Sequence, residues 1–167
     1  MSEKPTGKIT VKEICEKAEV NRSTFYLYCQ EPNNLLMELE DECIGVMTES
    51  LTNIGALVDD EINAKDLLLN FLRAVRRNDE LLYALLVKNS DPHFRRKFMA
   101  VALELIERLF NLKTREEYKA MSELFIVSGS VEILTKWIES RYEISEHSMC
   151  DMLYLFCEGL LGNIVNR

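Results

Sequence analysis

The sequence predicts an all-α fold with a small N-terminal head, residues 1–47, and a larger helical body, residues 48–167. Gly and Pro are scarce, at six and three of 167 residues, so few positions interrupt a helix. Apolar residues make up 47% of the chain, which is enough for a packed core. In most segments they recur at three- and four-residue spacing, the period of a helix buried on one face.

Residues 9–36 predict two short helices joined by a tight turn, with a third helix following at once. Thr10 suits a helix N-cap, and Glu13 three residues later completes a capping box. Asn21 suits a second N-cap, because its short side chain tolerates turn conformations. The first helix would bury one apolar face, made by Val11, Ile14, Cys15 and Ala18.

The outward positions of the second helix, residues 22–28, are unusual for a face that meets only water. Arg22 offers a guanidinium, Ser23 a hydroxyl, and Tyr26 and Tyr28 two phenols within two turns. These groups combine hydrogen-bond donors and acceptors with flat surfaces, so they suit phosphates and base edges in a major groove. The pattern therefore indicates a helix-turn-helix that reads DNA.

The same residues resemble the DNA-binding region of the TetR family of bacterial transcriptional repressors. The resemblance rests on Thr10-Val11-x-x-Ile14-Cys15-x-x-Ala18-x-Val20-Asn21-x-Ser23-Thr24-Phe25-Tyr26, with Leu35-Leu36 after a short connector. It implies that residues 22–28 form the recognition helix. The residues that it implies for DNA contact are Thr10, Asn21, Arg22, Ser23, Thr24, Tyr26 and Tyr28.

Two departures from the family pattern bear on DNA affinity. Relatives carry a further helix before this motif, whereas here Met1–Lys8 precede it and include Pro5 and Gly7. Where relatives commonly place a phosphate-binding Lys, this chain has Pro32. Residues 1–31 hold five basic and five acidic residues, so the formal charge of −8 falls on residues 32–167. A neutral head should bind DNA weakly, because phosphate neutralisation supplies most non-specific affinity.

Pro32 starts a predicted connecting helix that runs to about Leu51, and residues 52–61 fit either its extension or a loop. Asn63 and Asp66 mark the next helix start. That helix ends in Arg73, Arg76 and Arg77, which suit either a solvated C-terminal turn or contact with an anionic effector.

A short apolar segment, residues 81–87, precedes a restart at Asp91-Pro92, from which a helix should run to about Phe110. Aromatic and sulfur side chains gather on these helices. By resemblance to the TetR family this part of the body holds the effector pocket, although core packing explains the same residues equally well. The candidate ligand contacts are Phe71, Tyr83, Phe94, Phe98 and Met99.

Two final helices predict a homodimer. Thr114 should cap a helix that ends at Glu139 and is apolar on nearly every side, and Ser145 should start the last helix. Paired across a two-fold axis, they would form a four-helix interface, as the resemblance to the TetR family also implies. The candidate interface residues are Phe125, Gly129, Leu134, Trp137, Met152, Phe156 and Leu160.

Several classes of function find no support in the sequence. The two histidines, His93 and His147, lie far apart, and no motif indicates a catalytic site, a metal site or a cofactor. Five cysteines without a C-x-x-C favour buried thiols in a reduced cytoplasm. No run approaches about 18 apolar residues, so no membrane span is predicted.

The sequence thus predicts a regulator that is not an enzyme. It would repress transcription by binding operator DNA as a homodimer, and a small-molecule effector would control that binding. The alternative is a dimeric helical module for a ligand or a protein, which has lost autonomous DNA binding. The short segment before the motif and Pro32 motivate this alternative.

Overall fold

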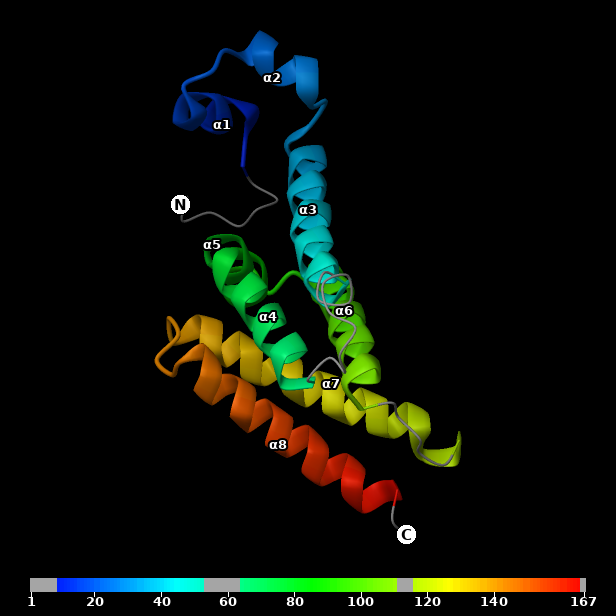
Figure 1. Cartoon of the computed structure of the whole chain (residues 1–167). Coiled ribbons are helices and arrows are strands. Elements are labelled where there is room, and N and C mark those ends of the chain that lie inside the picture. The colour runs from blue at the N-terminus through cyan, green and yellow to red at the C-terminus, as the bar shows by residue number, and fades with distance from the viewer. Residues whose placement is uncertain (1–8, 53–63, 111–115, 166–167) are drawn as a thin grey trace. The chain divides into compact units, whose positions relative to one another are not determined.

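The computed structural model describes residues 9–52, 64–110 and 116–165, and their regular structure is entirely helical (Figure 1). The predicted all-α class is therefore confirmed. The chain divides into two compact units, residues 1–43 and residues 44–167, which we call the head and the body. The division falls a few residues before the boundary expected after residue 47, and that finer boundary stays a prediction.

The head contains helices α1, Val11–Ala18, and α2, Arg22–Tyr28, with the predicted caps in place. The Glu13 amide donates to Thr10 Oγ1 at 3.3 Å, and the Thr10 amide donates to Glu13 Oε2 at 2.9 Å, which completes the capping box. Glu19 ends α1 in the left-handed conformation, at φ 56°. Asn21 Oδ1 accepts from the Thr24 amide at 2.8 Å and starts α2. Glu19, at the end of α1, and Asn21, at the start of α2, therefore fix the turn between the helices.

The core of the head is a small cluster of buried side chains contributed by α1, α2 and the residue after α2. Cys15, Phe25 and Cys29 are each less than a tenth exposed, and Val11, Ile14 and Leu35 pack against them. This cluster holds the two helices at a fixed angle. It follows that the opposite face of α2 is left to solvent.

Helix α3, Pro32–Thr52, begins at the predicted proline and contains the division between head and body. Residues 53–61, for which the sequence fits either an extension of this helix or a loop, lie outside the described residues, as does the predicted start at Asn63. The body then holds α4, Ala64–Arg77, whose buried side chains are Leu67, Leu68, Phe71, Leu72, Ala74 and Val75.

Beyond α4 the chain forms a short α5, Asp79–Leu82, which passes directly into a π-helix, Tyr83–Lys88. The sequence indicated only a short apolar segment here. The wider turn is closed by the Asn89 backbone amide and side-chain amide, which both donate to the Ala84 carbonyl, at 3.0 and 2.7 Å. Asp91 then caps α6, Pro92–Phe110, by accepting from the amides of His93 and Phe94.

The last two helices are α7, Glu116–Glu139, and α8, Glu146–Val165. The Thr114 cap expected for α7 lies outside the described residues, whereas Ser145 Oγ caps α8 by accepting from the Ser148 amide at 3.1 Å. The turn between the helices places Arg141 and Tyr142 in the left-handed region, at φ 56° and 63°. Trp137 Nε1 donates to the Ile144 carbonyl at 2.9 Å and holds the turn against α7.

The core of the body lies between α4, α6, α7 and α8. Helix α4 packs against α8 and α6, and α7 packs against α6 and the π-helix. Figure 1 shows α7 and α8 as a hairpin joined by the short turn. Phe71, Phe94 and Phe98 are completely buried, with ring centroids 6.1 Å apart for Phe71 and Phe98 and 6.3 Å apart for Phe94 and Phe98. These three rings form the centre of the body.

Candidate functional site

The outward face of α2 presents three large side chains in succession. Tyr26, Leu27 and Tyr28 are 58%, 79% and 81% exposed, and Arg22 is exposed one turn earlier. Phe25, on the inner side, holds Tyr26 by an edge-on ring contact at 5.5 Å between centroids. Leu27 was not among the expected contacts. It lies two residues after the buried Phe25, about 200° around the helix, so the helical period places it on the outward face.

The short polar residues expected to contact DNA are already hydrogen-bonded within the head. Ser23 and Thr24 donate their hydroxyls to Asn21 Oδ1 at 2.5 and 2.9 Å. Thr10 Oγ1 donates to Glu13 Oε2 at 2.8 Å. Arg22, Tyr26 and Tyr28 have no such hydrogen bond to a described residue. The structure therefore separates residues that shape the turn from residues whose donors are available to a ligand.

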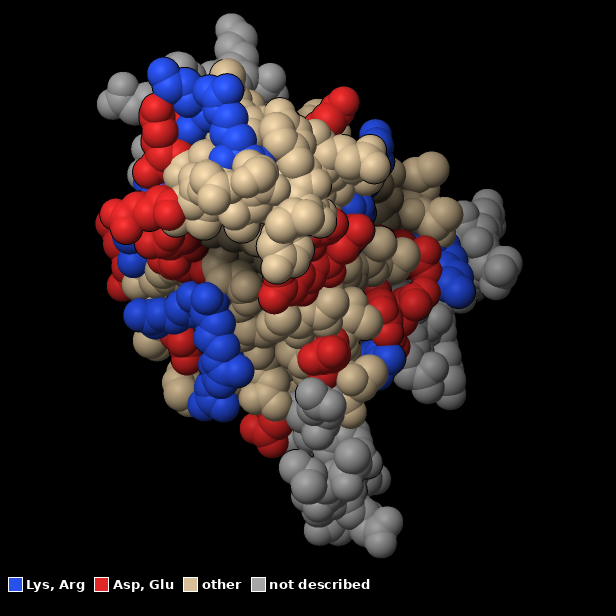
Figure 2. Space-filling model, turned by 90° about the horizontal axis from the view of Figure 1, so that it is seen from above, with Lys and Arg blue, Asp and Glu red and all other residues tan. Residues whose placement is uncertain are grey.

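The charge on the head is close to balanced. Residues 9–31 contain Lys12, Lys17 and Arg22 against four glutamates, and Lys12 pairs with Glu16 at 3.7 Å. On the face that Figure 2 views, Lys and Arg form separate small groups among acidic and uncharged side chains.

The outer face of α7 and α8 carries large apolar side chains that no described residue covers. Phe125 is 67% exposed, Phe156 48% and Leu160 40%, as expected for interface candidates. Gly129 is exposed and Met152 half-buried. The same face includes three residues that the sequence analysis did not select, namely Met121, Leu124 and Leu155, which are 70%, 56% and 63% exposed.

Two expected interface residues lie elsewhere. Leu134 and Trp137 are only 2% and 3% exposed, because they pack into the core of their own chain, so they are not available to a second copy. The ring of Trp137 meets Tyr142 edge-on at 4.7 Å. On a helix that is apolar on nearly every side, spacing alone does not distinguish the inner face from the outer face.

The candidate ligand contacts in the body do not form one pocket. Phe71, Phe94 and Phe98 pack on one another, and Tyr83 lies instead under the guanidinium of Arg141, 3.8 Å from the ring centre. Met99 is half-buried on α6. The enclosed cavity beside Phe71 measures about 20 Å³, with Ser130 and Cys157 on its wall. That volume holds about one water molecule, so these residues form a packed core in this conformation.

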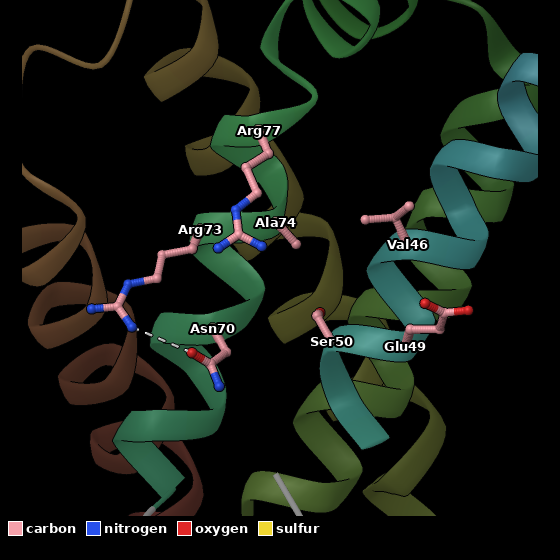
Figure 3. Close-up of a pocket in the computed structure, with 7 residues that line it drawn as sticks. All are labelled: Val46, Glu49, Ser50, Asn70, Arg73, Ala74 and Arg77. Atoms are coloured by element: carbon pink, nitrogen blue, oxygen red, sulfur yellow. Dashed lines mark hydrogen bonds between the residues drawn. The ribbon is translucent and has the colours of Figure 1, made fainter. Parts of the chain in front are cut away.

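A larger hollow lies between the second half of α3 and α4, both within the body (Figure 3). It measures about 280 Å³ and is open to solvent. We call it the α3–α4 groove. Its walls carry two of the arginines that the sequence indicated as either solvated or anion-binding. The residues that line it are Val46, Glu49, Ser50, Asn70, Arg73, Ala74 and Arg77.

Three further features bear on the class of function. All five cysteines are free and buried, and burial raises the pKa of the Cys150 and Cys157 thiols. Within the described ranges, no three His, Cys, Asp or Glu side chains group in a way that could hold a metal ion. Among the same residues, no helix has the length and apolar character to cross a bilayer.

The all-helical fold, with a short capped helix pair ahead of a helical body, defines a transcriptional regulator once the sequence comparison is added. Residues 63–159, more than half of the chain, match the TetR family model described as a transcriptional regulator C-terminal region. The chain belongs to the TetR family. No curated protein and no solved structure matches it significantly.

Proposed function

We propose that this regulator binds operator DNA as a homodimer through α2 and that a small-molecule effector controls the binding, so that it acts as a cytoplasmic bacterial repressor. The single observation that carries the proposal is the outward face of α2. It presents a guanidinium and two phenols with unengaged donors on a helix that Asn21 caps and Phe25 anchors in the core of the head. A family of regulators supplies the context.

The free donors on α2 divide into two roles. Arg22, in the first turn, meets a phosphate or a guanine edge, and Tyr26 and Tyr28 donate to phosphates. Leu27 lies between the tyrosines and suits contact with a thymine methyl group. In a two-fold dimer, the two α2 helices would enter successive major grooves about 34–36 Å apart.

A mobility-shift titration against the DNA upstream of the protein's own gene tests this proposal. Arg22→Ala and Tyr26→Ala should each weaken specific binding about tenfold or more. The matched control is Arg96→Ala, which removes an exposed arginine of α6 and should leave binding unchanged. Equal affinity of Arg22→Ala and the control would contradict a reading role for α2.

Dimerisation through α7 and α8 is the second part of the proposal. Six large apolar side chains are exposed on these two helices, and a contiguous exposed apolar patch commonly marks an interaction site. They are Met121, Leu124 and Phe125 on α7 and Leu155, Phe156 and Leu160 on α8. In a two-fold arrangement each patch would cover its counterpart. Gly129, which has no heavy atom within 4 Å of an added Cβ, leaves space for the partner helix.

Sedimentation of two charge variants tests the dimer. Phe125→Lys and Phe156→Lys should shift the protein from dimer to monomer, because a lysine in a desolvated interface has no partner charge. Leu27→Lys, at a position 79% exposed in the head, is the matched control and should leave the dimer intact. A dimer that persists in both α7 and α8 variants would place the interface elsewhere.

The alternative function is a dimeric helical binding module without autonomous DNA binding. It is favoured by the balanced charge of residues 9–31 and by Glu31 and Pro32 at the start of α3, where no cation is available for a phosphate. Feeble, sequence-indifferent binding by wild type and by Arg22→Ala alike would support this alternative over the repressor.

A further inference from the structure

We propose that the α3–α4 groove binds a small organic anion through its phosphate or carboxylate group, with Arg77 as the anion-binding residue. The site is distinct from the enclosed apolar cavity beside Phe71, because the two share no lining residue. Its use as the effector site rests on the proposed regulatory function, whereas the binding itself does not.

Arg77 is the most available cation of the groove. It is exposed in the last turn of α4 and forms no ion pair or hydrogen bond with a described residue. In the view of Figure 3 its guanidinium lies along α4, next to Ala74. A guanidinium has a planar fork of donors that matches the oxygens of a phosphate or a carboxylate. An anion in the groove would therefore meet unengaged donors.

Arg73 lies one turn before Arg77 on the same helix and is held only by long contacts. Its guanidinium donates to Asn70 Oδ1 at 3.4 Å and lies 3.9 Å from Glu146 Oε2. Arg76 also pairs with Glu146, at 3.5 Å. In Figure 3 the Arg73 guanidinium points away from α3, so Arg73 stays with Asn70 and Glu146, and Arg77 is the cation that the groove offers to a ligand.

The groove also contains one negative charge, on Glu49 of α3. In Figure 3 this carboxylate points away from α4, whereas Val46 points towards it. Arg73 is already paired with Glu146, so Arg77 provides the unpaired positive charge of the groove, in a chain whose formal charge is −8. The remaining lining residues are the polar Ser50 and Asn70 and the apolar Val46 and Ala74.

The size of the groove limits the ligand. Its volume of about 280 Å³ is just below the range of about 300–1,000 Å³ that holds drug-sized molecules. A small phosphorylated or carboxylated metabolite fits this space. Such a ligand would contact the last two turns of α3, a helix that runs without interruption from Pro32 to Thr52. Binding in the groove could thus be linked to the state of the head.

Titration calorimetry of the full chain, without DNA, tests the site. The probes are inorganic phosphate, glucose 6-phosphate, succinate and, as the uncharged control, glucose. We expect saturable binding of at least one anion and none of glucose. Stronger binding of glucose 6-phosphate than of succinate would assign the phosphate chemistry, and the reverse order would assign the carboxylate.

Matched variants locate the binding in the groove. Arg77→Gln should lower the affinity for the anion about tenfold, because it removes a charge-assisted contact. Glu49→Gln should strengthen it several-fold, which a merely structural effect would not produce. Arg96→Gln, with the same loss of charge on α6, should leave the affinity unchanged.

Two results would overturn the site: no saturable binding of any of the three anions, or equal loss of affinity in Arg77→Gln and Arg96→Gln. Failure of the proposed function has a different signature, since the mobility-shift and sedimentation experiments contain none of the three probe anions. If the protein binds an anion but does not bind DNA, the groove is still an anion-binding site, and only its regulatory role is contradicted.

Discussion

The head and the body differ in how each is held together. The buried cluster of the head consists of Cys15, Phe25 and Cys29, and two side-chain caps define its helix ends. The body buries three phenylalanine rings completely and packs four long helices around them. Apolar burial provides most of the folding free energy, so the body supplies the stability. The head depends more on local hydrogen bonds.

The two units also expose different kinds of large side chain. The head exposes Tyr26 and Tyr28, whose hydroxyls remain well solvated, whereas the body exposes Phe125, Leu155 and Phe156, which have no polar atom in the side chain. Tyrosines suit a wet surface such as a DNA backbone, and phenylalanine suits a dry contact with another helix. This contrast supports a nucleic-acid ligand for one unit and a protein partner for the other.

The largest expected effect is on the core of the body. Phe98→Ala should lower the free energy of unfolding by about 3–5 kcal/mol, because it leaves a cavity between Phe71 and Phe94. Denaturant unfolding followed by circular dichroism measures the change. Phe98→Leu is the conservative control, and its free energy of unfolding should fall clearly less. A loss below about 1 kcal/mol for Phe98→Ala would mean that the core is not closely packed.

A smaller and more local effect is expected in the head. Phe25→Ala removes the largest side chain of the head cluster, so α1 and α2 should lose their protection against amide hydrogen exchange. The amides of α4 and α6 should stay protected, since the body has its own core. Tyr26→Ala, at a side chain 58% exposed, is the control and should leave exchange in α1 nearly unchanged. Equal deprotection of both units would show that they unfold together.

The caps of the head provide a subtler test of the same contrast. Asn21→Ala removes the acceptor for the Thr24 amide and for two hydroxyls, and should destabilise α2 by about 1 kcal/mol. Hydrogen exchange of the first turn of α2 measures this change. Asn33→Ala, on the exposed side of α3, is the control. Unchanged exchange in Asn21→Ala would mean that packing of Phe25 alone holds the helix.

Local hydrogen bonds made the helices of the head predictable from the sequence. Which residues of the body are buried depended on tertiary packing, which the sequence did not reveal. Thr10, Glu13, Asn21 and Asp91 each cap a helix through atoms within three residues, so spacing alone identified them. Leu134 lines the same small cavity as Leu68, Ala102 and Leu153, which come from three other helices, so its burial depends on tertiary packing.

The candidate sites show the same division. The exposed donors of α2 follow from the period of one short helix. The α3–α4 groove forms only where two helices lie side by side. The sequence therefore indicated the arginines of α4 but not the α3 residues on the opposite wall. The π-helix at Tyr83–Lys88 also left no sequence signal, because it depends on how Asn89 closes the turn on Ala84.

The smallest expected effect concerns Tyr142, in the turn between α7 and α8. Burial and the nearby charge of Asp79 raise its pKa to about 12, against the opposing effect of Arg76 and Arg141. Its hydroxyl is buried and has no hydrogen-bond partner among the described residues. An unfolded tyrosine titrates near pH 10, so above that pH the unfolded chain loses the proton first and folding stability falls as pH rises.

Tyr142→Phe should therefore flatten part of the fall in melting temperature above pH 10. At neutral pH it should change stability by no more than about 1 kcal/mol, because it removes an unpaired polar group and keeps the ring against Trp137. Thermal melts across an alkaline pH series measure both effects, with Tyr28→Phe as the control for a hydroxyl lost from the surface. If the profile of Tyr142→Phe overlays that of wild type, the Tyr142 hydroxyl is solvated, and this turn is as open to water as the outward face of α2.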